Sequence, residues 1–384
     1  MRASHPSELP PARLRLCFVA QQAYGALCGR PTEHSGGIER QSALWARWFA
    51  ARGHDVSLLT WDEGQSEAAV DGVGIVKMCR RDQGLRGMRF FHPRWTSLAH
   101  ALERADADLY ACMCGDASLG QVALWCRARR RPLAYYVSST DAVNRTLGHL
   151  AARERLLYRV GLKRAERVMV QTRVQQEMLR EGFGVGAEVV PMPSEAMTPS
   201  ATPRSVVPEG ARVLWVGRFH PEKRLEWLLD VAQECPELAF DVVGAANDAS
   251  AYEREMHARA SALPNVRLHG RIAQRDALAE LYRRAALLCC TSPVEGFPNT
   301  FLEAWSHGLP VVTTFDPDGL TERLGMGAAA RDPAGIRTAI LALLSCSDTY
   351  RRASEAAWSY FQERHRPEIV LPQVERIFLE AAGR

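Results

Sequence analysis

The chain has 384 residues, of which 47% are hydrophobic and 24% charged, an ordinary globular composition that excludes extensive disorder. A chain of this length is too long for a single hydrophobic core and suits two α/β domains. The 48 basic and 44 acidic residues give a formal net charge of +4, which is too balanced to predict a nucleic-acid partner.

The N-terminal half alternates short apolar runs with helical stretches. Residues 1–12 are polar and proline-rich, and we expect a flexible tail there. A strand at Leu14–Ala20 is followed by a glycine-rich turn and by a helix at Ile38–Arg52, which stops at Gly53. Further strand-like runs are Val56–Thr60, Gly74–Met78, Asp108–Met113, Leu133–Val137, Arg167–Val170 and Glu188–Val190. The alternation predicts a parallel sheet covered on both faces, spanning residues 13–190.

Five prolines between Pro191 and Pro208 mark a linker, because neither a helix nor a central strand would tolerate them. A second alternating series then occupies residues 209–365. Its expected strands are Val213–Val216, Phe240–Val243, Val266–Leu268, Leu287–Cys290 and Val311–Thr313, and its expected helices begin at Pro221 and near Ala251, Ala277 and Thr300. Two such sheets predict a cleft between domains, where ligands would bind beyond the carboxyl ends of the strands.

The cysteines and the N-terminal residues point to the cytosol. The ten cysteines include no CxxC pair, so the usual spacing of metal ligands is missing. Residues 1–15 lack the apolar region of a signal peptide, and no uncharged apolar run reaches about 18 residues. We therefore expect a cytoplasmic protein with reduced thiols and no bound metal.

Basic residues cluster in two places of the N-terminal half. One run comprises Arg127, Arg129, Arg130 and Arg131, and the other comprises Arg153, Arg155, Arg159, Lys163 and Arg164. A solvated helix face explains such runs, and so does attraction to anionic lipid or to an acidic acceptor. Both alternatives stay open from the sequence.

The segment Trp215–Arg224 carries the first group of residues with chemical interest. A strand runs into Gly217 and Arg218, and Pro221 stands where a first helical turn tolerates the missing N–H. Arg218 offers a fork of donors suited to phosphate, and Lys223 adds a point charge. Together they could neutralise a diphosphate without a metal ion, although an isolated pair of this kind is usually a solvated face.

The segment Thr291–Val312 carries the second group. Glu295 lies in the loop that leaves a strand, and Glu303 lies about one turn inside the helix that follows. The N-terminus of that helix suits an anion such as a diphosphate, and the carboxylates beside it can accept hydrogen bonds from sugar hydroxyls.

The pair GRFHPEK and EGFPNTFLEAWSHGLPVV resembles the donor-binding signature of family 4 retaining glycosyltransferases, in order and separation. The segments HSGGIER and RGHDV resemble the glycine loop of that family and its following elements. The likeness is strongest over Val213–Thr314 and weakest between Glu63 and Arg131. It implies the GT-B fold: two Rossmann-like domains that face a cleft, with residues 366–384 forming a C-terminal helix that returns to the N-terminal domain.

The resemblance also implies roles for individual residues. Arg218 and Lys223 would bind the donor diphosphate and stabilise its departure, Glu303 would bind the ribose, and Glu295 would hold hydroxyls of the transferred sugar. The remaining donor-binding residues would be Gly36, Gly37 and Gly217, then Arg271 and Ile272 near the base, and Gly296, Phe297, Asn299 and Thr300 along the sugar and phosphates.

Two departures from the family pattern stand out. Pro298 occupies a position where many relatives supply a backbone N–H, so one hydrogen bond to the donor is absent. No histidine follows the strand that ends at Val137, where many members carry one. Ser139 and Asp141 therefore become candidates for contact with the transferred sugar or the acceptor, and Asp141 is counted among the catalytic candidates.

The sequence thus predicts a retaining transferase that moves a sugar from a nucleoside diphosphate sugar, without a cofactor or metal, in cell-surface polysaccharide or glycolipid synthesis. The acceptor would be a sugar, a lipid-linked sugar or a small molecule, and the enzyme would be cytoplasmic or peripheral at the inner face of the membrane. A GT-B nucleotide-sugar epimerase would share the fold and the diphosphate site. An inactive nucleotide-sugar-binding module is the third alternative, suggested by the missing histidine.

Overall fold

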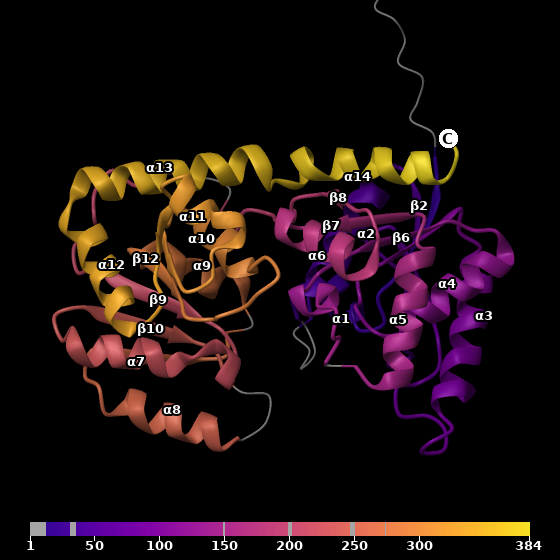
Figure 1. The fold of residues 1–384 in the computed structure, drawn as a ribbon, viewed down its shortest axis with the longest axis horizontal. Coiled ribbons are helices and arrows are strands. Elements are labelled where there is room, and N and C mark those ends of the chain that lie inside the picture. The colour runs from indigo at the N-terminus through magenta and orange to yellow at the C-terminus, as the bar shows by residue number, and fades with distance from the viewer. Residues whose placement is uncertain (1–12, 31–35, 149, 199–201, 246–249, 273) are drawn as a thin grey trace, which may run out of the picture.

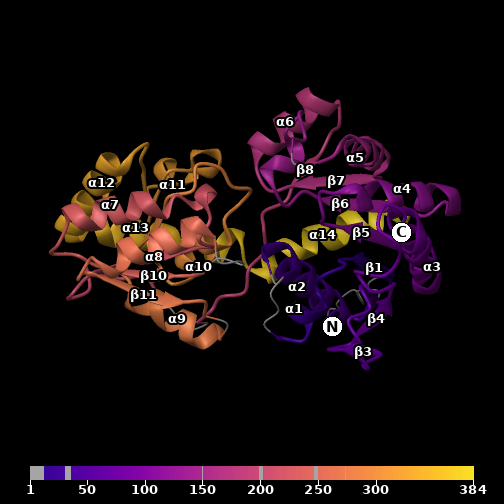
Figure 2. The ribbon, with the colours of Figure 1, turned by 90° about the horizontal axis from the view of Figure 1, so that it is seen from below.

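The computed structural model describes residues 13–30, 36–148, 150–198, 202–245, 250–272 and 274–384 (Figure 1). The predicted tail of residues 1–12, and His34 and Ser35 of the glycine loop, lie outside the described residues. The chain forms two α/β domains, each built on its own sheet, and they lie side by side as Figure 2 shows. The predicted fold class is confirmed.

The first sheet has eight strands, all parallel except for the edge pair β3 and β4. In sheet order they are β3 (Ala69–Val70), β4 (Val73–Lys77), β2 (Asp55–Thr60), β1 (Arg15–Val19), β5 (Leu109–Cys112), β6 (Leu133–Tyr136), β7 (Arg167–Val170) and β8 (Glu188–Val189). The helices and helical turns of this domain are α1 (Tyr24–Leu27), α2 (Gly37–Ala51), η1 (Phe90–Trp95), α3 (Thr96–Ala105), α4 (Ala117–Arg129), η2 (Thr140–Val143), α5 (Ala152–Arg164) and α6 (Arg173–Phe183).

The second sheet has six parallel strands. In sheet order they are β11 (Val266–Gly270), β10 (Ala239–Val243), β9 (Arg212–Val216), β12 (Leu287–Cys290), β13 (Val311–Thr313) and β14 (Gly327–Ala329). The helices and turns are η3 (Pro221–Lys223), α7 (Leu225–Glu234), α8 (Ala251–Ser261), α9 (Arg275–Arg284), α10 (Asn299–Ser306), η4 (Pro317–Gly319), α11 (Leu320–Arg323), α12 (Pro333–Ser345) and α13 (Ser347–Arg364), followed by α14 (Pro367–Ala381).

One predicted element is wrong in detail. The helix expected from Pro221 is interrupted at Arg224, whose φ of 46° lies in the left-handed region. Pro221–Lys223 therefore forms a separate short turn, η3, and α7 begins at Leu225. The interruption leaves Lys223 at the end of a turn instead of on the side of a long helix.

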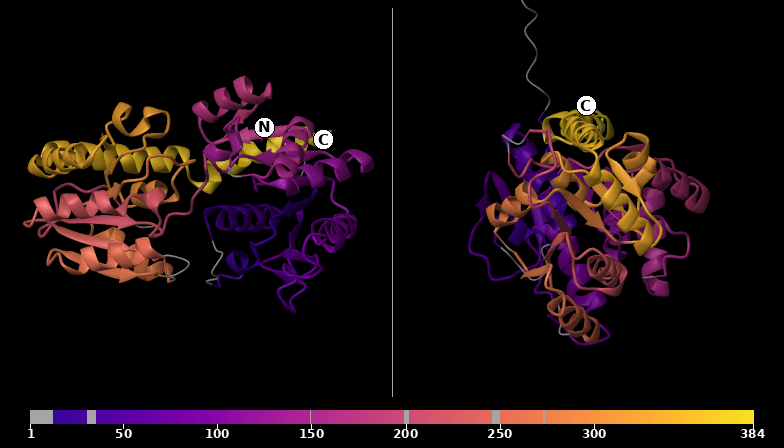
Figure 3. Two further views of the ribbon diagram at one scale, coloured as in Figure 1. Left: turned by 60° about the horizontal axis from the view of Figure 1, so that its bottom comes forward. Right: turned by 90° about the vertical axis from the view of Figure 1, so that its left-hand side faces the viewer.

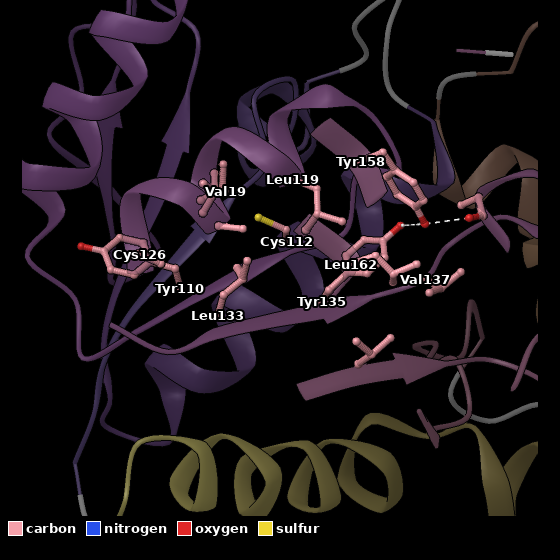
Figure 4. Close-up of a cluster of buried hydrophobic side chains, with 14 of the residues drawn as sticks. Val19, Tyr110, Cys112, Leu119, Cys126, Leu133, Tyr135, Val137, Tyr158 and Leu162 are labelled. Carbon is pink, nitrogen blue, oxygen red and sulfur yellow. Dashed lines mark hydrogen bonds between the residues drawn. The ribbon is translucent and has the colours of Figure 1, made fainter. Parts of the chain in front are cut away.

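The N-terminal domain packs helices on both faces of its sheet. On one face, α4 and α5 approach backbone to backbone. The approach requires glycine at position 120, since a Cβ there would lie 2.1 Å from the carbonyl oxygen of Leu157. Figure 4 shows the buried cluster beneath them, in which the hydroxyl of Tyr158 donates to the carbonyl of Ala142 at 2.7 Å and lies 3.3 Å from that of Tyr135. Tyr158 thereby anchors η2, the turn that carries Asp141.

The C-terminal helix returns to the N-terminal domain. Helices α13 and α14 lie end to end along one side of both domains (Figures 1 and 3). The buried face of α14 packs against α2, with the ring of Phe378 stacked on Phe49 at 5.3 Å. Glu375 forms an ion pair with Arg52 at 3.1 Å and accepts a hydrogen bond from Nε2 of His54 at 2.8 Å, since Nδ1 of that ring accepts from the N–H of Leu14. Among the described residues, no helix is both long and apolar enough to cross a membrane.

His365 joins the two places where the chain crosses between domains. It lies between α13 and α14, and its Nδ1 contacts the carbonyl oxygen of Met192 at 2.8 Å in the other crossing segment. Its own carbonyl accepts a hydrogen bond from the N–H of Ser194 at 2.7 Å. Burial lowers the pKa of His365 to about 4.

Folding stability should therefore depend on the protonation of His365. The pKa of His365 is lower in the folded chain than the ordinary value of 6.5. The neutral ring therefore contributes fully to the free energy of unfolding above pH 6.5, and this contribution is lost as the pH falls toward 4. Between pH 7 and pH 5 we expect the free energy of unfolding to drop by about 2 kcal/mol through this group. Urea unfolding of the wild type, of His365→Gln and of the exposed control His100→Gln at both values checks this. An equal pH dependence in wild type and His365→Gln would contradict it.

Candidate functional site

The N-terminus of α10 forms one wall of the site. Glu303 lies in the second turn of this helix, is 8% exposed, and accepts a hydrogen bond from the hydroxyl of Tyr282 at 2.7 Å. Burial, and then the negative charge of Glu303, raise the pKa of Tyr282 well above its usual value. The hydroxyl of Tyr282 therefore keeps its proton and, as a hydrogen-bond donor, orients the Glu303 carboxylate.

Arg40 reaches the same carboxylate from the other domain. It lies in α2, and its Nη1 is 3.1 Å from Oε1 of Glu303. The helix dipole disfavours a cation in the first turn of a helix. Arg40 departs from this preference and instead makes a contact across the domains. The pair is half-open to solvent on the Arg40 side.

The N-terminus of α2 faces that of α10. A Cβ on Gly37 would lie 2.3 Å from Nδ2 of Asn299, so glycine allows the close approach. The backbone N–H of Gly36 donates to the carboxylate of Glu39 at 2.9 Å, which caps the helix. The amide of Gln41 donates to the carbonyl of Pro193 at 2.9 Å and lies 3.5 Å from Oδ1 of Asn299. Two helix N-termini thus converge on one place, which favours an anion.

Lys223 and Glu295 form a close ion pair, and each side chain is about four-fifths buried. The carbonyl of Lys223 accepts a hydrogen bond from the hydroxyl of Thr291 at 2.6 Å, and that hydroxyl accepts one from the indole N–H of Trp215 at 3.0 Å. These bonds hold η3 against β9 and β12. The core of the second domain therefore fixes the backbone of Lys223, and Glu295 holds its ammonium group.

Arg218 follows Gly217 at the end of β9 and is exposed. In the part of the chain that the structure describes, no carboxylate forms an ion pair with its guanidinium. The loops after β9 and β10 touch at their backbones, since a Cβ on Gly244 would lie 1.7 Å from the carbonyl oxygen of Gly217. Glycine at position 244, with φ of 142°, allows this close approach of the two loops.

The loop at Glu295 and Gly296 lies against the N-terminal domain. The hydroxyl of Thr140 donates to the carbonyl of Glu295 at 2.5 Å. A Cβ on Gly296 would lie 2.7 Å from the carbonyl oxygen of Ser138. The structure thereby brings Glu295 to the turn that carries Asp141. The carboxylate of Asp141 itself is exposed and makes no hydrogen bond with a described side chain, while its N–H donates to the hydroxyl of Ser139 at 3.2 Å.

Replacing Gly296 with alanine tests how closely the domains must approach. The added methyl group would collide with the backbone of Ser138, which must move away with its turn. We expect kcat to fall about 10- to 100-fold while nucleotide affinity is kept. Steady-state kinetics check this, with Gly186→Ala as the control because a Cβ there meets nothing within 4 Å. An unchanged kcat would show that the close contact is dispensable.

The remaining predicted residues lie around this centre. Phe297 is buried, with its ring 5.1 Å from that of His365, so only its backbone can face a ligand. Thr300 lies in the first turn of α10, beside Asn299. Arg271 and Ile272 follow β11, and the carbonyl of Gly270 accepts a hydrogen bond from the N–H of Gly244 at 2.9 Å. Arg271 is exposed, and Ile272 packs partly against the core of the second domain.

Sequence reasoning missed several residues that fix the site. Tyr282 orients Glu303 within the second domain. Arg40 and Thr140 reach Glu303 and the loop of Glu295 from the first domain. Asp318 accepts hydrogen bonds from the backbone N–H groups of Arg173 and Val174, at 2.8 and 3.1 Å, and so caps α6 from the other domain. Arg40 stood in a segment that resembled the family, but nothing in the sequence pointed to its partner.

Comparisons with known proteins identify the family of the chain. Residues 210–346 match the family model "Glycosyl transferases group 1", and residues 36–194 match "Glycosyl transferase 4-like domain". The chain is 28% identical over 152 residues to the GtfA subunit of the UDP-N-acetylglucosamine–peptide N-acetylglucosaminyltransferase of Streptococcus pneumoniae. That match covers 38% of this chain and only 29% of the relative.

Three solved structures resemble the whole chain in fold. Anabaena Alr3699/HepE, in complex with UDP and glucose, has a TM-score of 0.73 at 17% identity and covers 95% of this chain and 99% of its own. Sucrose-phosphate synthase from Thermosynechococcus elongatus has a TM-score of 0.74 at 16% identity, with 95% and 98% covered. WaaG, described as a glycosyltransferase involved in lipopolysaccharide biosynthesis, has a TM-score of 0.69 at 16% identity, with 94% and 99% covered.

Proposed function

Because this chain belongs to glycosyltransferase family 4 and has the GT-B fold, we propose that it transfers a sugar from a nucleoside diphosphate sugar to an acceptor hydroxyl with retention at the anomeric carbon. The observation that carries the proposal is the convergence of two helix N-termini, α2 and α10, with Lys223 paired to Glu295 in the loop that leads into α10. Arg218, exposed at the end of β9, is the second cation that we assign to this place. Backbone N–H groups and cations at one place are what a diphosphate requires.

The proposed chemistry is leaving-group stabilisation. Negative charge grows on the diphosphate as the glycosidic bond breaks, and the cations of Arg218 and Lys223 meet that charge. We assign this role to the two side chains and not to a metal ion. The acceptor hydroxyl attacks from the face that the diphosphate leaves and passes its proton to the departing phosphate, so the transfer uses no enzymic base.

Glu303 and Glu295 are proposed to bind the two sugars of the donor. Glu303, oriented by Tyr282, would accept hydrogen bonds from the ribose hydroxyls. Glu295, paired with Lys223, would accept them from the transferred sugar, and Asp141 faces this sugar or the acceptor from the N-terminal domain. Since two of the relatives are known in complexes with UDP, a UDP-sugar is the first donor to test.

The proposed acceptor is a sugar or a lipid-linked sugar of a cell-surface polysaccharide or glycolipid. The likeness to WaaG supports this class of product. The proposal places the enzyme in the cytoplasm, in peripheral contact with the inner face of the membrane through the basic side of its N-terminal domain.

Incubation with a panel of nucleotide sugars tests the proposal. A thermal-shift screen against UDP-, GDP- and ADP-sugars first identifies the donor, because a ligand that binds only the folded state raises its Tm. Release of nucleoside diphosphate that depends on an acceptor supports transfer. Interconversion of the sugar would instead indicate an epimerase, and binding without turnover an inactive module.

A further inference from the structure

The N-terminal domain exposes an unusual group of large apolar side chains. Leu85, Met88 and Phe91, in the segment between β4 and α3, are 75%, 65% and 55% exposed, and Leu156 on α5 is 65% exposed. The two segments touch, because the guanidinium of Arg153 lies 3.8 Å from the centre of the Phe90 ring and 5.9 Å from that of Phe91. We call Leu85, Met88, Phe91 and Leu156 the apolar surface.

Arginines are frequent in the two segments that carry the apolar surface. Residues 80–94 and 145–159 together contain nine arginines and only two carboxylates, Asp82 and Glu154. The nine are Arg80, Arg81, Arg86, Arg89, Arg94, Arg145, Arg153, Arg155 and Arg159. The carboxylate of Glu154 accepts a hydrogen bond from the N–H of Ala151 at 3.1 Å. Within the described ranges, none of the nine forms an ion pair with a carboxylate. Arg94 is half-buried against the ring of Trp61, and most of the others are exposed.

Both segments lie at the edge of the sheet that carries the acceptor side of the site. The segment with Leu85 follows the carboxyl end of β4, and α5 begins shortly after η2, the turn of Asp141. In parallel sheets the carboxyl ends of the strands share one edge. Figure 1 shows the start of α5 and the segment before α3 on the lower edge of this domain.

An apolar centre with a rim of arginines matches the chemistry of a phospholipid interface. Apolar side chains enter the boundary of the acyl chains, while guanidinium groups bind the phosphates of the headgroups. We propose that the apolar surface binds an anionic phospholipid bilayer and thereby brings the Asp141 side of the cleft to the membrane. This rests on the proposed function in one respect, because a lipid-linked acceptor would then be presented beside the cleft.

A basic cavity elsewhere on the same domain provides an internal control for the flotation experiment. A cavity of about 800 Å³ lies between the ends of α4 and α5, lined by Arg127, Arg130, Arg131, Lys163 and Arg164. These are the C-terminal ends of both helices, whereas Leu156 and Arg153 lie in the first half of α5. Large exposed apolar side chains are missing from its described lining, so charge alone would act there.

Flotation with vesicles tests the proposal on the full chain. The wild type should float with vesicles of equal parts phosphatidylglycerol and phosphatidylcholine, and much less with phosphatidylcholine alone. The triple variant Leu85→Gln/Met88→Gln/Phe91→Gln should bind the anionic vesicles about tenfold more weakly than the wild type, or weaker still. Matched controls are Val206→Gln/Ile369→Gln, which changes apolar side chains 63% and 51% exposed elsewhere, and Arg127→Glu/Arg130→Glu/Lys163→Glu in the cavity.

The outcomes separate this inference from the proposed function. Loss of flotation in the apolar variant alone supports it. The inference is overturned if the wild type does not float, or if only the cavity variant loses flotation. It is also overturned if the wild type binds protein partners but no vesicles. Nucleotide binding by the same preparations is the separate readout: if it is kept while flotation fails, only the membrane surface is wrong.

Discussion

Replacing Lys223 with alanine is expected to lower kcat by about 100- to 1000-fold, the usual effect of removing one preorganised group that stabilises developing charge. The backbone of Lys223 is held by the hydrogen bond from Thr291 to its carbonyl, and its ammonium is held by the pair with Glu295, so we expect little reorganisation as the diphosphate departs. Binding of the intact donor should change less than kcat, because the leaving group gains charge only as the bond breaks.

Two further variants separate catalysis from folding in this experiment. Lys223→Ala leaves the carboxylate of Glu295 without its counter-ion, so Lys223→Ala/Glu295→Gln shows whether that charge contributes to the loss. Arg224→Ala is the neighbouring control, since its guanidinium lies 4.5 Å from the ring centre of Trp227 and outside the site. Steady-state release of nucleoside diphosphate is the measurement. A kcat unchanged in Lys223→Ala, with Tm also unchanged, would remove Lys223 from the mechanism.

Replacing Glu303 and Arg40 is expected to change nucleotide affinity in opposite directions. Glu303→Ala removes the carboxylate proposed for the ribose hydroxyls and should weaken nucleoside diphosphate binding by about 10- to 100-fold. Arg40→Ala removes the side chain that holds the same carboxylate at 3.1 Å. Since that ion pair is half-exposed and weak, binding should tighten by at most about fivefold.

Titration calorimetry with UDP measures both effects. Tyr282→Phe is a useful companion, because it leaves Glu303 in place but removes the hydrogen bond that orients it. Its effect should be smaller than that of Glu303→Ala. If Glu303→Ala binds as the wild type does, the ribose assignment fails. If Arg40→Ala weakens binding as much as Glu303→Ala does, Arg40 is a ligand of the nucleotide and not a competitor for Glu303.

The strands and the C-terminal motifs could be predicted because their signals are local. Buried parallel strands such as Leu287–Cys290 are continuous apolar runs, and the carboxylate of Glu303 lies one turn into α10, where its position in the motif put it. The interruption at Arg224 could not be predicted, since a left-handed backbone is rare for arginine and no glycine marks it.

Contacts across the cleft could not be predicted for a different reason. Arg40 and Glu303 are 263 residues apart, and Thr140 and Glu295 are 155 apart. Such pairs depend on how two finished domains meet, which no periodicity within either domain encodes. The apolar surface could not be predicted because its loop falls in the segment where the family likeness is weakest. Only the folded chain shows that Arg153 of α5 lies against this loop.

A crystal structure of the chain with a bound nucleoside diphosphate sugar tests the central claim most directly. The phosphates should lie between the N-termini of α2 and α10, within hydrogen-bonding distance of the Arg218 guanidinium and the Lys223 ammonium, and the ribose should contact Glu303. Phosphates bound elsewhere, with Arg218 and Lys223 turned toward bulk solvent, would contradict the assignment of this site.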